Sequence, residues 1–266
     1  MLELQSFPGI NIQSLSQYIL LLLLSTLRIG SFLLSSPFFG SRMVPLPVRI
    51  VFSFSLGIWF LNNLKFPYFE KLQGVDLVPI IFQEISIGLI CGMILSICFG
   101  TVILAGEKIA ATSGLAFASQ VDPSSGAQSP VISQIFSLFL TILFFSVNGH
   151  LVIFELIIKS FDTFPLGSAV NLKNAIGSAI GASGFLYDTA VIIVLPIVSI
   201  LFFLNLGIGF ITKSAPQLNL FSFGFPLTIL STFFVLYFSV DALQFVFTDL
   251  IDKAIGILKV ILEGFK

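Results

Sequence analysis

The feature that most constrains this chain is a set of apolar runs long enough to cross a lipid bilayer. The longest covers residues 78–104, and at a rise of 1.5 Å per residue it would extend about 40 Å, beyond a hydrocarbon core of roughly 30 Å. Only 9% of the residues are charged, whereas soluble domains have roughly 25%. The chain is therefore predicted to be an integral membrane protein in which this run tilts, bends or protrudes.

Six apolar runs are expected to form helices in a single integral membrane domain that covers residues 1–266. They lie at about residues 15–34, 50–61, 78–104, 131–158, 185–211 and 223–247. The second run is short for a span of about 20 residues, so we expect it to be tilted, incomplete or packed against protein. The predicted fold is all-α, a polytopic membrane protein of about six hydrophobic helical segments.

A stretch rich in small residues, 106–130, separates the third run from the fourth. Charges at Glu107 and Asp122 would each cost roughly 2.5 to 3.5 kcal/mol at the centre of a lipid-facing helix. Pro123 disfavours helical angles at the residue before it and stiffens that end of the segment. Because irregular backbone at membrane depth is tolerated beside a water-filled cavity, this plug-like loop is predicted to line or close a passage. A surface loop is the alternative.

The composition of this loop suits a movable seal. Leu115 and Phe117 are large enough to exclude water, whereas Gly114 and Ala118 permit bending and sliding. Gly106 is expected to mark the flexible end of the segment. These residue types suit either a segment that lines or closes a passage or a loop on the surface.

Several polar residues lie inside the apolar runs, where a lipid-facing bundle would not tolerate them. They are Arg28, Glu84, Asn148, His150, Glu155, Asn205 and Asp241. We expect these groups to surround an aqueous path or to meet other subunits, since one chain of six runs cannot satisfy them all. In particular, Arg28 must pair, line a cavity or snorkel, and Glu84 needs a partner.

Small residues recur at every fourth position after Glu84 in the third run, at Gly88, Gly92, Ser96 and Gly100. Such a row lets a second helix approach closely in the small-xxx-small manner. We therefore expect these positions to serve helix packing or assembly. Simple packing within the bundle is the alternative. It explains the glycines fully but explains Glu84 less well, because a buried carboxylate needs a partner.

Composition also excludes several function classes. A formal net charge of −1 without a basic cluster argues against nucleic-acid binding. One histidine and two cysteines, with no cluster of ligands around them, supply neither a transition-metal site nor a Ser-His-Asp arrangement. We expect no enzyme, no catalytic residue, no metal and no cofactor. A polytopic solute transporter remains an alternative, and an intramembrane enzyme is disfavoured.

Longer motifs carry a resemblance to a known family. They are GEKIAATSGLAFASQVDP at 106–123, NGH at 148–150, SFDTFPLG at 160–167 and LNLGIGFITKSAPQLNLFSFGFPL at 204–227, preceded by Arg28 and Pro37. From about residue 15 onward the chain resembles the flagellar biosynthetic protein FliR family of the type III secretion export gate. One departure is Lys213, where the family pattern leads us to expect Arg; lysine keeps the charge but loses bidentate geometry.

The resemblance implies a non-enzymatic subunit of the bacterial inner membrane, within the flagellar basal body. Such a subunit would assemble with the FliP and FliQ proteins, near FlhB and FlhA, and pack against these partners and membrane lipid. It would help to form and close the channel that passes unfolded flagellar proteins, with residues 106–122 as the plug. The related injectisome subunit is the alternative. Packing or assembly roles are expected at Arg28, Pro37, Asn205, Gly209, Pro216, Gln217, Gly224 and Pro226.

Overall fold

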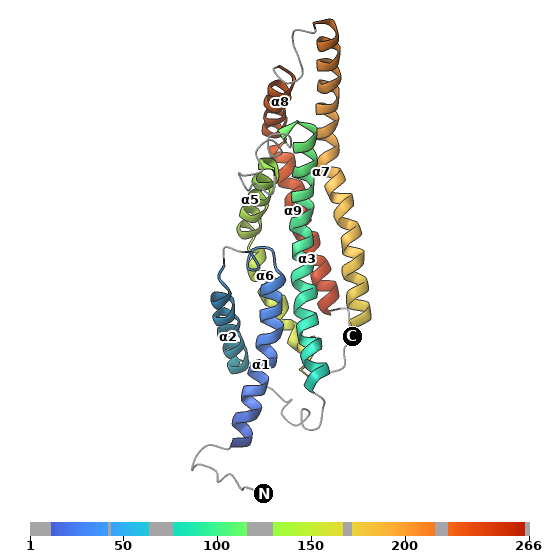
Figure 1. Cartoon of the computed structure of the whole chain (residues 1–266). Coiled ribbons are helices and arrows are strands. Elements are labelled where there is room, and N and C mark those ends of the chain that lie inside the picture. Colours follow the sequence, from blue (N-terminus) through green and yellow to red (C-terminus); the bar gives the residue numbers. More distant parts are fainter. Residues whose placement is uncertain are drawn as a thin grey trace. The chain divides into compact units, whose positions relative to one another are not determined.

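The computed structural model describes residues 12–41, 44–63, 77–115, 130–166, 172–215 and 223–263. Across these ranges every regular element is a helix (Figure 1). The helices are α1 (Ile12–Ser35), α2 (Leu46–Asn63), α3 (Leu77–Thr112), α5 (Val131–Ser146), α6 (Gly149–Thr163), α7 (Leu172–Ser214), α8 (Phe225–Phe238) and α9 (Val240–Glu263).

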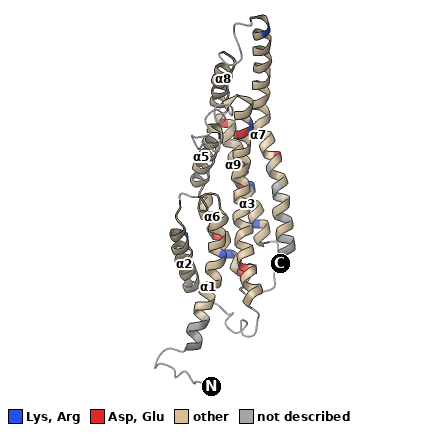
Figure 2. Ribbon diagram, viewed as in Figure 1, with Lys and Arg blue, Asp and Glu red and all other residues tan. Residues whose placement is uncertain are grey.

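Three of these helices are long and apolar enough to cross a membrane, over Tyr18–Ser35, Leu77–Thr112 and Tyr187–Ser214. The number rises to five if α5 with α6, and α8 with α9, each form one broken span. α2 is a shorter apolar helix. Positions coloured as charged residues are sparse along the ribbon in Figure 2. The expected all-α, polytopic membrane fold is confirmed.

Some predicted helix boundaries are wrong. The run predicted at 131–158 breaks at Asn148, which adopts a left-handed backbone with φ 55° that asparagine tolerates better than most residues. The run at 223–247 breaks after Phe238, where α8 and α9 meet at an angle of 66°. α7 begins at Leu172, before the run predicted at about residues 185–211.

The boundary between α3 and the small-residue loop also differs from the prediction. α3 continues to Thr112, so Gly106 and Glu107 lie in helical backbone and Gly106 is not the flexible end of the loop. A Cβ atom at Gly106 would lie 2.5 Å from Ser133 Cα on α5, so a close helix contact explains this glycine. The helix is instead followed by Gly114, whose φ of +83° is rarely adopted by residues with side chains.

The chain divides into two compact units. One contains the described residues of Met1–Ser96, Leu151–Ile180 and Gly256–Lys266, and the other those of Ile97–His150 and Gly181–Ile255. α3, α6, α7 and α9 contribute residues to both units. We refer to them as the first and the second unit.

The core of the first unit joins α1, α2, α3 and α6. Its buried cluster comprises Leu21, Leu24, Phe60, Leu61, Ile80, Phe161 and Leu166. The rings of Phe60 and Phe161 lie 4.1 Å apart between centroids. A Cβ atom at Gly57 of α2 would lie 2.8 Å from the side chain of Thr26 on α1, so the two helices are in close contact.

The core of the second unit is mostly aliphatic and contains several packed aromatic rings. Phe247 of α9 is fully buried and packs edge to face on Phe136 of α5, with 5.6 Å between ring centroids. Phe99 of α3 packs in the same way on Phe144 of α5, at 6.0 Å. Each such pair adds about 0.5 to 1.5 kcal/mol beyond the area that it buries, so these rings tie α3, α5 and α9 together.

Candidate functional site

A buried ion pair links α1 to α3 in the first unit. Arg28 Nε donates to Glu84 Oε2 at 2.7 Å, and Arg28 Nη2 donates to Oε1 of the same carboxylate at 3.0 Å. Both residues are completely buried. The planar guanidinium fits a carboxylate in this bidentate way, which a lysine ammonium does not. The two groups that needed partners in the sequence therefore satisfy each other.

The same guanidinium also binds the C-terminal end of α6. Arg28 Nη1 donates to Ser160 Oγ and Nη2 to the carbonyl oxygen of Phe164, both at 3.0 Å. The Phe161 ring covers the guanidinium, with Cζ 4.0 Å from its centroid. Carbonyl groups at the end of a helix lack partners within the helix. The carbonyl of Phe164, directly after α6, accepts a hydrogen bond from this arginine instead. We call Arg28, Glu84, Ser160 and the Phe164 carbonyl the arginine network.

The row of small residues after Glu84 faces α1 over most of its length. A Cβ atom at Gly88 would clash with the backbone of Arg28, and one at Gly92 would lie 2.8 Å from the Phe32 carbonyl oxygen. Ser96 Oγ donates to the Ser35 carbonyl oxygen one turn further on. This is a close helix–helix seam inside the chain. A role for the row in assembly with other subunits stays a prediction.

Gly100, the last member of the row, differs because nothing lies within 4 Å of a Cβ atom built on it. It lines a hollow of about 300 Å³ in the second unit together with Glu107 and Tyr187. A larger groove of about 720 Å³ continues from it between α3 and α7, lined by mostly apolar residues such as Leu104 and Phe203.

The C-terminal end of α3 is held by side chains of two other helices. Asn205 Nδ2 of α7 donates to the Thr112 carbonyl oxygen at 3.2 Å. Thr228 Oγ1 of α8 lies 3.0 Å from the Ser113 carbonyl oxygen. The Phe225 ring lies directly beside Gly114, with Cδ1 only 2.5 Å from where a Cβ atom would be. We call these contacts the α3 end contacts.

The other predicted packing residues that the structure describes take part in neither the arginine network nor the hydrogen bonds at the end of α3. Pro37 follows the end of α1 at Ser35, and Pro226 is in the first turn of α8, where proline fits a helix. Gly224 is the buried N-cap of α8, whereas Gly209 is exposed on α7 with no neighbour for a Cβ atom. The predicted residues that lie outside the described parts of the chain are Phe117, Ala118, Asp122, Pro123, Pro216 and Gln217.

Several of the intramembrane polar groups have partners within the chain, whereas the buried Nδ1 of His150 has no hydrogen-bond partner among the described residues. Arg28 pairs with Glu84, and Asn205 binds a helix end. The exposed Glu155 pairs with Lys159 at 2.5 Å, and Asp241 is exposed in the first turn of α9. The contacts of Arg28 and Asn205 join distant parts of the chain, whereas Glu155 and Lys159 are only one helical turn apart. The need for partner chains stays a prediction.

Sequence reasoning missed the partners on α6 and α8. Ser160 reads as an ordinary polar residue just after the run predicted at 131–158, and no local pattern marks it as an arginine ligand. A signal did exist on α8, where Thr228 and Thr232 are buried four residues apart in an apolar helix. Hydroxyl groups at helical spacing in such a run indicate a face that packs on other backbone. Within the described residues, no three His, Cys, Asp or Glu side chains form a group that could bind a metal.

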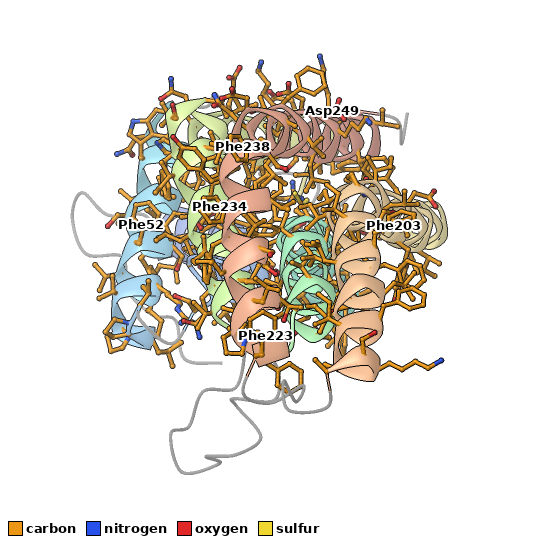
Figure 3. The ribbon with its side chains drawn as sticks, turned by 90° about the horizontal axis from the view of Figure 1, so that it is seen from above. Phe52, Phe203, Phe223, Phe234, Phe238 and Asp249 are labelled. Carbon is orange, nitrogen blue, oxygen red and sulfur yellow. The ribbon has the colours of Figure 1, made fainter. Side chains whose placement is uncertain are left out.

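α8 exposes several of its large apolar side chains and buries its two threonines. Figure 3 shows Phe223, Phe234 and Phe238 spaced along this segment; Phe234 is 56% exposed and Phe238 is 80% exposed. α7 is similar, with Phe203 70% exposed. Exposed apolar surface of this extent marks a contact with lipid or with another protein.

Comparison with known proteins connects this architecture to bacterial protein export. The family model "Bacterial export proteins, family 1" matches residues 19–254. The flagellar biosynthetic protein FliR of Escherichia coli (strain K12) is 31% identical over 76% of this chain and 77% of that protein. The same protein of Bacillus subtilis (strain 168) is 32% identical over 80% of this chain and 83% of its own length. The Aquifex aeolicus (strain VF5) protein is 27% identical over 94% and 96%. An all-α membrane protein matched along nearly its whole length in this way belongs to the bacterial export proteins of family 1, the family of the flagellar biosynthetic protein FliR.

Proposed function

We propose that the chain is a non-enzymatic subunit of the flagellar type III export gate, located in the bacterial inner membrane within the flagellar basal body. Its family makes it a component of flagellar biosynthesis and export. As a gate subunit it would help to form and close the channel that passes unfolded flagellar proteins out of the cytoplasm. The relatives named above are flagellar proteins, which favours this system over a virulence injectisome.

The observation that carries the proposal is the apolar surface of α7 and α8. Phe210 of α7 is 71% exposed and Phe238 of α8 is 80% exposed. Burying one such ring is worth roughly 1.5 to 3 kcal/mol, so a surface with many of them favours association with lipid and with other apolar chains. We propose the FliP and FliQ proteins as the partners that cover part of it in a hetero-oligomer, with FlhB and FlhA nearby.

Assembly is tested by purification in a mild detergent. Expressed together with FliP and FliQ, the chain should elute as a large hetero-complex that contains all three proteins. A combined Phe234→Ser and Phe238→Ser variant should lower the yield of the complex while leaving the chain folded by circular dichroism. A chain that is monodisperse by itself and restores export without those partners would contradict the proposal.

We further propose that the segment after α3 closes the passage at rest. Leu115 and Phe117 would form the seal, while Ala118 lets it slide and Asp122 and Pro123 end it. Gly106 and Glu107 lie within α3, so in this proposal they belong to the helix that carries the segment and not to its movable part. The left-handed backbone of Gly114 supports the proposal, because it turns the chain out of the axis of α3 at that point.

Ion conductance tests closure. Deleting residues 115–119 leaves α3 and the contacts at its end intact, and should increase the conductance of the reconstituted complex. A deletion of equal length at residues 66–70, between α2 and α3, is the matched control and should leave conductance unchanged. Wild-type conductance in intact complexes that lack residues 115–119 would return this stretch to the surface-loop interpretation.

A further inference from the structure

We infer that Asn205 and Thr228 are positioning residues that hold the C-terminal end of α3 and thereby fix where the chain leaves that helix. The inference deepens the proposed function and rests on it for one consequence: release of this end should open the passage. The contacts themselves do not depend on that function. All of them lie in the second unit.

The end of a helix is where a contact from elsewhere has the most effect. The last carbonyl groups of a helix have no partner in the helix and are usually satisfied by water, a cap or another side chain. Here the carbonyl of Thr112 accepts from Asn205, and the carbonyl of Ser113 lies within hydrogen-bonding distance of Thr228. Asn205 and Thr228 come from α7 and α8, so two separate helices hold the same short segment.

Thr228 can be distinguished from an ordinary threonine in an apolar helix. Such a residue usually donates its single hydroxyl proton to a carbonyl three or four positions earlier in its own helix. Thr232 does this, at 2.7 Å from the Thr228 carbonyl oxygen. Thr228 reaches its own-helix acceptors at 3.2 and 3.0 Å and also the Ser113 carbonyl oxygen at 3.0 Å. Both threonines are buried, so they form a matched pair that differs in the contact with α3.

Phe225 contacts the same end of α3. Its ring occupies the space beside Gly114 that any side chain at that position would need. Ser113 N also donates to the Ile109 carbonyl oxygen at 2.9 Å, which keeps the last turn of α3 closed. The end of the helix is thus fixed by hydrogen bonds from two neighbouring helices and by a ring, and all three must yield before it can move.

Amide hydrogen exchange of the purified complex tests this inference directly. Thr228→Val preserves shape but removes the hydroxyl, and Asn205→Leu removes the amide. Because one hydrogen bond of ordinary net strength corresponds to about fivefold in an opening equilibrium, each variant should speed exchange over residues 109–115 about fivefold. Thr232→Val, the matched control, should leave exchange in that peptide unchanged, and Thr228→Ser should restore the wild-type rate. Unchanged exchange in the combined Asn205→Leu and Thr228→Val variant overturns the inference.

Conductance of the same complexes tests the link to closure. The combined variant should conduct more than the wild type, Thr232→Val should match the wild type, and Thr228→Ser should reverse the effect of Thr228→Val. The inference is overturned if the combined variant exchanges faster but conducts no more than the wild type, while the complex that lacks residues 115–119 does conduct more. If the deletion also leaves conductance at the wild-type level, the closure proposal fails. The exchange rates alone then decide whether Asn205 and Thr228 hold the end of α3.

Discussion

Removing one member of the arginine network should destabilise the first unit strongly. In Glu84→Leu, Arg28 would keep its charge but lose the carboxylate that accepts two of its four hydrogen bonds. Breaking a buried pair in this way costs about 3 to 5 kcal/mol, because an uncompensated charge remains in the interior. Arg28→Met should cost a similar amount, since the Glu84 carboxylate would then be buried alone.

The combined Arg28→Met and Glu84→Leu variant should be far more stable than either single variant. Replacing a whole buried pair by apolar residues of similar volume is often neutral or stabilising. The remaining loss is at the Phe164 carbonyl, which would lack its donor at a cost of about 1 to 3 kcal/mol. Ser160 retains the Ile157 carbonyl oxygen of its own helix as an acceptor. We expect the combined variant to lie within about 3 kcal/mol of the wild type.

The assay is denaturant unfolding in detergent micelles, followed by the fluorescence of Trp59. This is the only tryptophan in the chain, and it lies on α2, in the same unit as the network. Its signal therefore reports the unit in which the change is made. Glu155→Gln, which breaks the exposed pair with Lys159, is the matched control and should leave the midpoint unchanged.

The reasoning would be refuted by additive energies. If each single substitution costs less than about 1 kcal/mol, or if the combined variant loses the sum of the two, the charges are not paired in a dry interior. A loss that Arg28→Lys fully avoids would also contradict the account. Lysine keeps the positive charge but cannot reproduce the planar, bidentate contact with Glu84 while reaching the end of α6.

Two further substitutions test the glycines of α3. Gly92→Leu should reduce complex yield and cost at least about 1 to 3 kcal/mol of unfolding free energy, because even its first side-chain atom would meet the Ser35 side chain. Gly100→Ala, which meets nothing, should be neutral or stabilise by about 0.5 to 1 kcal/mol; equal losses in the two variants would contradict the seam. Gly114→Ala should cost about 1 to 2 kcal/mol from its left-handed backbone alone, plus the displacement of Phe225. Thermal melting of the complex checks this, and an unchanged midpoint would contradict the assigned backbone.

The apolar runs and the membrane class could be predicted because they depend only on local composition. The exact helix ends could not, because packing overrides local signals. Gly106 reads as a helix breaker, yet it lies within α3 where Ser133 leaves no room for a side chain. Asn148 reads as one polar residue in a long run, yet its left-handed backbone divides that run into two helices.

The candidate site shows the same division between local and tertiary information. The sequence marks Arg28 and Glu84 individually as groups that need partners, but they are 56 positions apart and their pairing follows from the fold. Asn205 stands out in an apolar run in the same way, whereas its acceptor at Thr112 is 93 positions away. Polar outliers can thus be found from sequence, but their partners depend on helix packing.

Photocrosslinking to a stalled export substrate shows whether this chain borders the export path. A photoreactive phenylalanine analogue at Leu115, in cells whose export is blocked by a substrate that cannot finish its passage, should form an adduct between this chain and the unfolded substrate. The same analogue at Phe210, exposed on α7, is the control and should react with lipid or partner subunits instead. If Leu115 gives no substrate adduct while other gate subunits are crosslinked by that stalled substrate, the chain does not border the export path.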